Sequence, residues 1–463
     1  MVQVRPGSRS KDDLPDTVRT KTIRTQDSGA ALCVIPLIGD AFAIRCAVTP
    51  VTPRYAEGGA RSLRGMTTYT DIATVNVVVI GGGYAGTGAA NRLLARPGVK
   101  VTLVNPRPQF VERIRLHQYV AGTRNATLDY GTLLGDRVTL LVDRATRIDA
   151  DARKVHLASG RTLGYDYLIY AVGSTAAIPA AVPGSAEFAY PIGEWEHAQR
   201  LRAAIDRAPA DASVTVVGGG STGIETAAEL ADQGRKVTLV CGAQLAPTFS
   251  APARRSVARW FGKHAVEVLE QERVAEVGPD SVVLTDGTVL PSAVTIWTCG
   301  FGVPELAAAS GLRTDEAGRL LTDEALVSVD DDRIVAAGDS AAPSGRALRM
   351  SCQAAAPLGL HAADTVLALV AGVAPVNQNI GFVGAGVSLG RKAATVQFTR
   401  RDDTNKNMYL RGRWGVPIKE LASKGAVMGI RNEARKPGSA YTTKGPGHRP
   451  AAIAGESDRI ARP

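Results

Sequence analysis

The sequence has few cysteines and no closely spaced cysteine pair. Its 463 residues include five cysteines, and none of them shows CxxC or CxxxxC spacing. Such spacings are typical of zinc sites and of local redox disulfides, so the sequence predicts no metal site and no thiol–disulfide exchange. This cysteine usage best suits a reducing cytoplasm. The five residues are Cys33, Cys46, Cys241, Cys299 and Cys352.

Long apolar runs are also missing. No uninterrupted apolar stretch approaches the roughly 18 to 20 residues that a membrane-spanning helix needs. The first thirty residues are polar, whereas a signal peptide has a basic start that leads directly into an apolar stretch. We therefore expect a cytoplasmic protein, either soluble or peripheral on the inner face of the membrane.

Positive charge is concentrated near the C-terminus. Residues 391–436 contain twelve Lys or Arg against four Asp or Glu, a surplus of eight out of a net charge of +10. Because the excess is local, it does not by itself indicate a nucleic-acid partner, and we expect none. Apolar residues such as Ile418 and Leu421 alternate with the basic ones near helical spacing. The segment is compatible with peripheral membrane contact, packing on the domain or a homodimer interface.

One βαβ pattern occurs twice. From Asn76 the chain reads NVVVI, GGGYAG, a helix-forming stretch and KVTLV, which ends at Val104. From Ser213 it reads SVTVV, GGGSTG, a second helix-forming stretch and KVTLV, which ends at Val240. Strand, glycine turn, helix and strand in this order form a nucleotide-binding unit. The sequence thus predicts an α/β fold with two Rossmann-like domains.

The glycine spacing suits a pyrophosphate. In Gly81-x-Gly83-x-x-Gly86 the first glycine permits the tight turn, the second lets the backbone approach the phosphates, and the third lets helix and strand pack closely. Gly218, Gly220 and Gly223 repeat the pattern. Two dinucleotides in one chain indicate electron transfer between them. Because a cofactor carries that chemistry, no catalytic side chain is assigned with certainty.

The acid expected about twenty residues after each loop, where it would bind the ribose, is absent. Asn105 stands there in the first unit and Cys241 in the second. Asn can donate to and accept from a ribose hydroxyl, so binding at the first loop is preserved. At the second loop, loss of the acid removes a repulsion against a 2′-phosphate, and the choice between NADH and NADPH stays open.

Three further motifs carry a family resemblance. They are YDYLIYAVGS at residues 165–174, TIWTCGF at 295–301 and RIVAAGDSA at 333–341. With the two glycine loops, they make residues 75–437 resemble the FAD-dependent pyridine nucleotide-disulfide oxidoreductases. Within these, the chain is most similar to the branch of type II NADH dehydrogenases and apoptosis-inducing-factor-like proteins.

The resemblance implies FAD at the first loop, NAD(P)H at the second, and hydride transfer from nicotinamide to flavin. Asp339 matches the family Asp that hydrogen-bonds the ribityl chain of FAD. Gln353 and Glu225 are candidates for lining the flavin, the latter near the nicotinamide end of NADH. The resemblance adds Tyr84, Ala85, Ala145, Ala171, Gly173 and Gly338 to the FAD site, and Thr222 and Gly300 to the NAD(P)H site.

The sequence leaves the electron acceptor open. Type II NADH dehydrogenases carry AQxAxQ facing flavin and quinone, and here Gln353 is kept while Pro357 replaces the second Gln. This weakens the prediction of a quinone acceptor. A ferredoxin- or rubredoxin-type reductase would instead dock an acidic redox protein on the basic segment. A redox-sensing interaction protein that binds FAD and NADH is the alternative from another class.

The expected organisation inserts the NAD(P) domain into the FAD domain. The FAD domain takes residues 74–190 and 295–375, and the NAD(P) domain takes 191–294. An α+β interface region follows at 376–437, and the chain ends in a disordered tail at 438–463. Residues 1–73 read as a poorly ordered extension, and Met66 is a candidate for the true start of translation.

Overall fold

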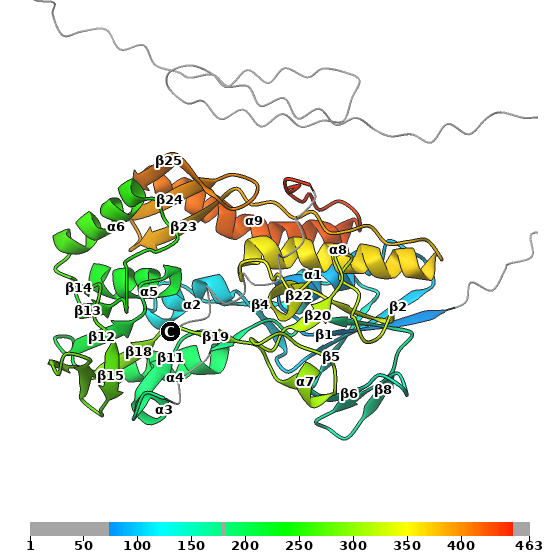
Figure 1. Ribbon diagram of the computed structural model, residues 1–463, viewed down its shortest axis with the longest axis horizontal. Coiled ribbons are helices and arrows are strands. Elements are labelled where there is room, and N and C mark those ends of the chain that lie inside the picture. Colours follow the sequence, from blue (N-terminus) through cyan, green and yellow to red (C-terminus); the bar gives the residue numbers. More distant parts are fainter. Residues whose placement is uncertain (1–73, 177–180, 448–463) are drawn as a thin grey trace, which may run out of the picture. The chain divides into compact units, whose positions relative to one another are not determined.

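The computed structural model describes residues 74–176 and 181–447 (Figure 1). The predictions of an extension at 1–73 and of a start at Met66 lie outside these residues. In the described part of the chain, no helix is both long and apolar enough to cross a membrane.

The first sheet is built from five parallel strands in the order β21-β9-β1-β2-β5. Its inner strands are almost wholly buried, which explains their continuous apolar runs. Val77 and Val79 belong to one buried cluster, and Val78 and Ile80 belong to another, so both faces of the sheet are covered. β1 pairs with β2 in the register Val77 to Val101. The strands are β1 (Val75–Ile80), β2 (Val99–Asn105), β5 (Val138–Val142), β9 (Tyr167–Tyr170) and β21 (Ile334–Ala336), and α1 (Tyr84–Leu93) joins β1 to β2.

The second sheet has five parallel strands in the order β11-β18-β12-β13-β14. They are β11 (Ala189–Pro191), β12 (Ser213–Val217), β13 (Lys236–Val240), β14 (Glu267–Leu269) and β18 (Val294–Trp297), and α5 (Ser221–Asp232) joins β12 to β13. Because β18 pairs with both β11 and β12, this sheet begins before residue 191 and extends past residue 294.

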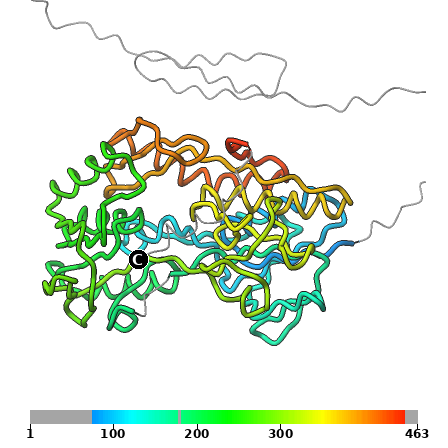
Figure 2. Tube along the Cα trace, viewed as in Figure 1, coloured from blue at the N-terminus to red at the C-terminus, as the bar shows by residue number. Residues whose placement is uncertain are grey.

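The internal duplication is longer than the βαβ pattern indicates. An antiparallel meander of three strands precedes the return strand in each unit: β6 (Ala145–Asp149), β7 (Lys154–Leu157) and β8 (Thr162–Gly164) in the first, and β15 (Val274–Val277), β16 (Ser281–Leu284) and β17 (Val289–Pro291) in the second. β21 then rejoins the first sheet beside β9, so chain from both sides of the second unit meets there (Figure 2). The predicted fold class is confirmed.

A helix and a small antiparallel sheet follow. α8 (Cys352–Val370) packs against α1, and α9 (Gly415–Arg435) packs against α1 and β24 (Figure 1). Gly359 permits the close approach of α8, because a Cβ there would lie 2.1 Å from the Ala85 carbonyl oxygen. The sheet consists of β23 (Gly384–Leu389), β24 (Ala393–Thr399) and β25 (Asn405–Gly412).

Residues 438–447, predicted to belong to a disordered tail, pack instead on the body. The N–H groups of Gly438 and Ala440 donate to the buried Glu433 carboxylate. Gly381 N–H donates to the Thr443 carbonyl (2.8 Å), and Lys444 forms a β-bridge with Ile380. Backbone pairing with a segment some 60 residues earlier in the chain is not visible in local composition. Residues 448–463 lie outside the described residues.

The remaining elements are short or connecting. They are β3 (Gln109–Val111), η1 (Arg113–Arg115), α2 (Leu116–Val120), β4 (Thr127–Asp129), η2 (Tyr130–Thr132), β10 (Thr175–Ala176), α3 (Ser185–Phe188), α4 (Trp195–Arg207), α6 (Ala251–Lys263), β19 (Phe301–Gly302), α7 (Leu306–Ala309), β20 (Leu320–Thr322), η3 (Gly338–Ser340) and β22 (Ala341–Pro343).

Candidate functional site

The first glycine loop has the geometry of a dinucleotide-binding turn. Gly81 has φ +100°, a conformation that glycine adopts without strain. A Cβ on Gly86 would lie 1.8 Å from the Gly81 carbonyl oxygen, whereas nothing lies within 4 Å of a Cβ on Gly83. This open space precedes the N-terminus of α1, where backbone N–H groups favour a phosphate. The loop therefore fits a pyrophosphate.

The second loop repeats this geometry. Gly218 has φ +124°, and a Cβ on Gly223 would lie 1.9 Å from the Gly218 carbonyl oxygen. Nothing lies within 4 Å of a Cβ on Gly220, at the N-terminus of α5. The chain thus presents two open helix N-termini of the same construction.

Both loops reach one cavity of about 660 Å³. Gly83 and Tyr84 line it from the first loop, and Ser221 and Thr222 line it from the second. Asp339, from η3, also lines it. Two dinucleotides bound at these loops would therefore extend into the same space.

A chain of hydrogen bonds fixes Asp339. The Ser174 hydroxyl donates to Asp339 Oδ2 (2.7 Å), and Arg113 Nη1 donates to the Ser174 carbonyl (2.8 Å) and hydroxyl (3.1 Å). Arg113 Nε donates in turn to the Gly193 carbonyl (2.9 Å). Ser174 lies in the chain after β9, and Arg113 is the first residue of η1. Two segments that are distant in the sequence therefore orient this carboxylate. Within the described residues, no hydrogen bond reaches its Oδ1, which could therefore accept from a sugar hydroxyl.

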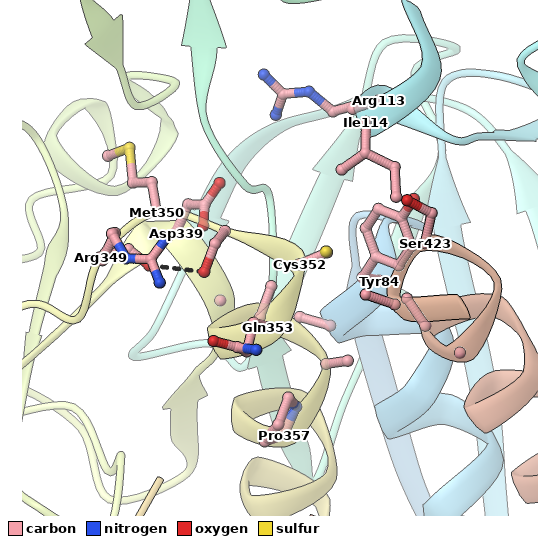
Figure 3. Close-up of a pocket in the computed structure, with 18 of the residues that line it drawn as sticks. Tyr84, Arg113, Ile114, Asp339, Arg349, Met350, Cys352, Gln353, Pro357 and Ser423 are labelled. Carbon is pink, nitrogen blue, oxygen red and sulfur yellow. Dashed lines mark hydrogen bonds between the residues drawn. The ribbon is translucent and has the colours of Figure 1, made fainter. Parts of the chain in front are cut away.

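The first turn of α8 forms another wall of the cavity (Figure 3). Ser351 caps this helix, because its hydroxyl accepts from Ala354 N–H (3.3 Å). Gln353 Oε1 is buried and has no hydrogen-bond partner within the described part of the chain. A buried amide oxygen without a partner is costly, and a ligand with a donor group would satisfy it. Burial raises the pKa of the neighbouring Cys352 thiol, which stays neutral.

Glu225, on α5, lies in a buried ionic cluster at the edge of the cavity. Its Oε1 lies 2.9 Å from Lys419 Nζ, on α9, and accepts from Ser388 N–H (2.9 Å). His117 Nδ1, on α2, is 3.9 Å from Glu225 Oε2. Burial opposes ionisation of Glu225, but Lys419, His117 and the Ser388 N–H together lower its pKa. Burial also lowers the pKa of His117 to about 4, so the imidazole is neutral at neutral pH.

The predicted site residues fall into three groups. Ten line the cavity: Gly83, Tyr84, Ala85, Ala171, Gly173, Thr222, Glu225, Gly338, Asp339 and Gln353. Five shape the two loops: Gly81, Gly86, Gly218, Gly220 and Gly223. Four do not line the cavity: Asn105, Ala145, Cys241 and Gly300. Asn105 Oδ1 instead accepts from Gly82 N–H (2.9 Å), so its amide supports the loop itself.

The cavity also contains residues that sequence reasoning missed. Lys419 and Ser423 reach it from α9, and Tyr441 reaches it from the segment that follows. No motif marks these positions, because they depend on how the C-terminal region packs on the two sheets. Pro357, which the sequence singled out, lines the cavity one turn after Gln353.

Apolar side chains line one part of the cavity, which we call its apolar half. Its walls come from α8, α9, β24 and the chain just before β23, through Leu360, Val383, Val396, Phe398, Ile418, Ala422 and Ile430. Ile418 and Ala422 are also exposed, so this half reaches the protein surface along α9. On the same face of α9, at helical spacing, Trp414, Leu421 and Met428 are exposed.

Comparisons with known proteins agree with this geometry. Residues 75–359 match the family model described as pyridine nucleotide-disulphide oxidoreductase. A NADH dehydrogenase-like protein of Mycobacterium tuberculosis is 33% identical over 321 residues, 63% of this chain and 80% of that protein. A type II NADH:quinone oxidoreductase of Staphylococcus epidermidis is 26% identical over 404 residues, 74% of this chain and 98% of that protein.

Solved structures share the fold. NDH2 from Plasmodium falciparum in complex with NADH superposes with a TM-score of 0.66 at 16% identity, covering 78% of this chain and 98% of that one. The sulfide:quinone oxidoreductase of Aquifex aeolicus superposes with a TM-score of 0.65 at 20% identity, covering 78% and 92%.

Proposed function

This chain belongs to the pyridine nucleotide-disulphide oxidoreductase family and is an FAD-dependent NAD(P)H oxidoreductase, and from this premise we propose that it delivers electrons to a lipophilic quinone at a membrane surface. One observation carries the proposal. A single cavity joins both glycine loops to an apolar half that reaches the surface beside an exposed apolar stripe on α9.

The proposal assigns the two loops separately. Gly83 and the α1 N-terminus would hold the FAD pyrophosphate, with Asp339 on the ribityl hydroxyls and Gln353 beside the flavin ring. Gly220 and Thr222 would hold the NAD(P)H pyrophosphate, and Glu225 would lie near the nicotinamide. FAD, when bound, supplies the two-electron carrier that accepts hydride and releases electrons.

The chain itself positions the two nucleotides and excludes water from the space between them. The two helix N-termini would fix the phosphates, and the shared cavity would bring the reacting ends of both nucleotides together. Hydride transfer would then occur between two bound and oriented groups rather than in a bimolecular encounter. The apolar wall excludes water from that space. In the part of the chain that the structure describes, Cys241, Cys299 and Cys352 are unpaired, so we assign no dithiol to the reaction.

The acceptor is assigned from the apolar half of the cavity. A quinone ring has a large apolar surface, and burying it against Val396, Phe398 and Ile418 is favourable. Pro357 offers no side-chain hydrogen bond there, so apolar contact dominates recognition. Supporting a quinone further, the matching Staphylococcus protein is by name a NADH:quinone oxidoreductase.

The membrane contact is assigned from α9. Trp414, Leu421 and Met428 form its exposed apolar stripe, and Lys424 and Arg435 lie beside them. Apolar side chains flanked by basic ones are typical of helices that lie at an anionic membrane surface. A quinone dissolved in the bilayer would then enter at Ile418.

The test measures reduction of the flavin and its reoxidation by the acceptor. We expect purified protein to be yellow, NADH to bleach its flavin absorbance under anaerobic conditions, and a quinone in vesicles containing anionic lipid to restore it. Leu421→Ser should slow reoxidation by vesicle quinone several-fold and leave ferricyanide reduction unchanged. Val289→Ser, at a similarly exposed position on β17, serves as the matched control.

Other outcomes would contradict the proposal. A colourless protein that cannot be reconstituted with FAD would contradict the flavoenzyme assignment. Reoxidation that is fast with an acidic redox protein, falls with ionic strength and ignores vesicles would replace the quinone by a protein acceptor, for which the basic surplus of residues 391–436 would provide the docking charge.

A further inference from the structure

The second glycine loop lacks the usual acid after β13. Another negatively charged residue nevertheless lies close to it. Cys241 follows β13, where an acid commonly binds the ribose hydroxyls. Its side chain packs on the loop, because a Cβ on Gly219 would lie 2.8 Å from Cys241 Cβ and 2.9 Å from its Sγ. Cys241 therefore supports the loop as a small apolar group and brings no charge.

An acid approaches the same edge from the neighbouring strand. β13 and β14 are parallel, with Val240 opposite Leu269, and Cys241 N–H donates to the Leu269 carbonyl (2.8 Å). Glu270, the first residue after β14, thus stands beside Cys241. Its Oε2 accepts from Leu245 N–H (3.2 Å), which holds the half-buried carboxylate against the turn that follows Cys241.

The charged groups near Cys241 differ in their effect on the pKa of its thiol. Burial, then Glu270 and Cys299, raise the pKa of the Cys241 thiol to about 12. Arg273 is a nearby cation. Its Nε donates to the carbonyl of Gly242, the residue after Cys241 (3.2 Å), but its side chain is exposed, and it is not among the groups that shift the Cys241 pKa. The carboxylate of Glu270 is therefore the charged group that acts on the Cys241 thiol.

We propose that Glu270, from the end of β14, replaces the missing acid and makes the second loop select NADH over NADPH. This inference rests on the proposed NAD(P)H site. The carboxylate accepts hydrogen bonds from the ribose hydroxyls of NADH, and it repels the additional negative charge of a 2′-phosphate. Selectivity then comes from a strand that the βαβ pattern does not include.

Fragments that lack the nicotinamide test the site without turnover. Binding of ADP-ribose and of 2′-phospho-ADP-ribose to the full, FAD-containing protein is measured by titration calorimetry. We expect the wild type to bind ADP-ribose about tenfold or more tightly than its 2′-phosphorylated form. Glu270→Gln should bring the two affinities to within about threefold, because Gln keeps the acceptor for Leu245 N–H and removes the charge.

Two further variants provide control and rescue. Arg273→Gln removes a charge of opposite sign close by and should leave the affinity ratio unchanged within about twofold. Adding Cys241→Asp to Glu270→Gln places the acid at the usual position and should restore discrimination against the 2′-phosphate.

Three results would overturn the assignment. The first is an unchanged affinity ratio in Glu270→Gln with unaltered thermal stability. The second is a wild-type preference for the 2′-phosphorylated fragment. The third is that Arg273→Gln no longer binds that fragment. Failure of both fragments to bind would be a different result, because it would contradict the nucleotide site of the proposed function itself.

Discussion

At the scale of single residues, the site depends on polar groups whose partners come from distant parts of the chain. Asp339 is held by Ser174, which is held by Arg113. His117 and Glu225 are buried side by side, one neutral and one ionised. Such groups respond strongly to substitution, because burial makes both charge and hydrogen bonding expensive to alter.

Asp339→Ala should lower FAD affinity about tenfold or more, because a charge-assisted hydrogen bond to a sugar hydroxyl is lost. The flavin-to-protein ratio after gel filtration, followed by titration with FAD, measures this. Asp332→Ala removes an exposed acid from the same segment and should keep full flavin content. Unchanged occupancy in Asp339→Ala would remove the ribityl assignment.

His117 should make the protein less stable in mild acid. Its pKa is lowered to about 4 in the folded protein, so below about pH 6.5 the unfolded chain binds the proton first. Between pH 6.5 and 4 this group alone should cost the folded state up to about 3 kcal/mol.

Urea unfolding across that range should therefore show a smaller loss of stability in His117→Gln than in the wild type. The matched control substitution is His156→Gln, which removes a half-buried imidazole outside this cluster. Equal pH dependence in His117→Gln and the wild type would mean that folding does not lower the pKa of this imidazole.

At the scale of elements, the two glycine loops are equivalent in shape and differ in what surrounds them. Asn105 hydrogen-bonds the first loop, while Cys241 only packs against the second. Gly83 and Gly220 have φ −79° and −80°, which any residue adopts, and both positions have open space. Alanine can therefore be introduced at either without backbone strain.

Gly83→Ala and Gly220→Ala should each weaken the binding of a different nucleotide. Each methyl group would stand where a pyrophosphate approaches the helix N-terminus and should weaken that nucleotide about tenfold. Gly83→Ala should lower FAD content, and Gly220→Ala should weaken NADH binding while the protein stays yellow. Each variant is the control for the other, and the reversed pattern would exchange the two assignments.

At the scale of the whole molecule, α9 ties the C-terminal region to both nucleotide-binding units. Lys419 pairs with Glu225 on α5, and the next residue, Glu420, pairs with the buried Arg115 (3.1 Å) and with Arg124 (3.3 Å). Arg115 also pairs with Glu112 (3.2 Å). The helix that lines the apolar half of the cavity is therefore held by ionic contacts with Glu225 on α5 and with Arg115.

Arg115→Met should destabilise the protein by about 3–5 kcal/mol, because it leaves Glu112 buried without its cation. Arg124→Met removes a more exposed partner of the same Glu420 and should cost less than about 1 kcal/mol. Urea unfolding of both variants measures the difference. Similar small losses in both would show that the Arg115 network contributes little to docking α9.

The sequence by itself determined the parts of this protein whose chemistry is local. The two glycine loops, the strands that precede them and Asp339 could be predicted, because turn, helix start and buried strand are encoded within about ten neighbouring residues. Ten of the predicted residues accordingly line one cavity. The fold class followed from the repetition of that local pattern.

Only the tertiary structure decided what surrounds the loops. Lys419 reaches Glu225, Glu270 stands beside Cys241, and residues 438–447 pack on the chain near Ile380 rather than forming a tail. These contacts depend on which strands become neighbours and where α9 packs. That choice is made by burial of apolar surface over the whole chain, and no short stretch of sequence records it.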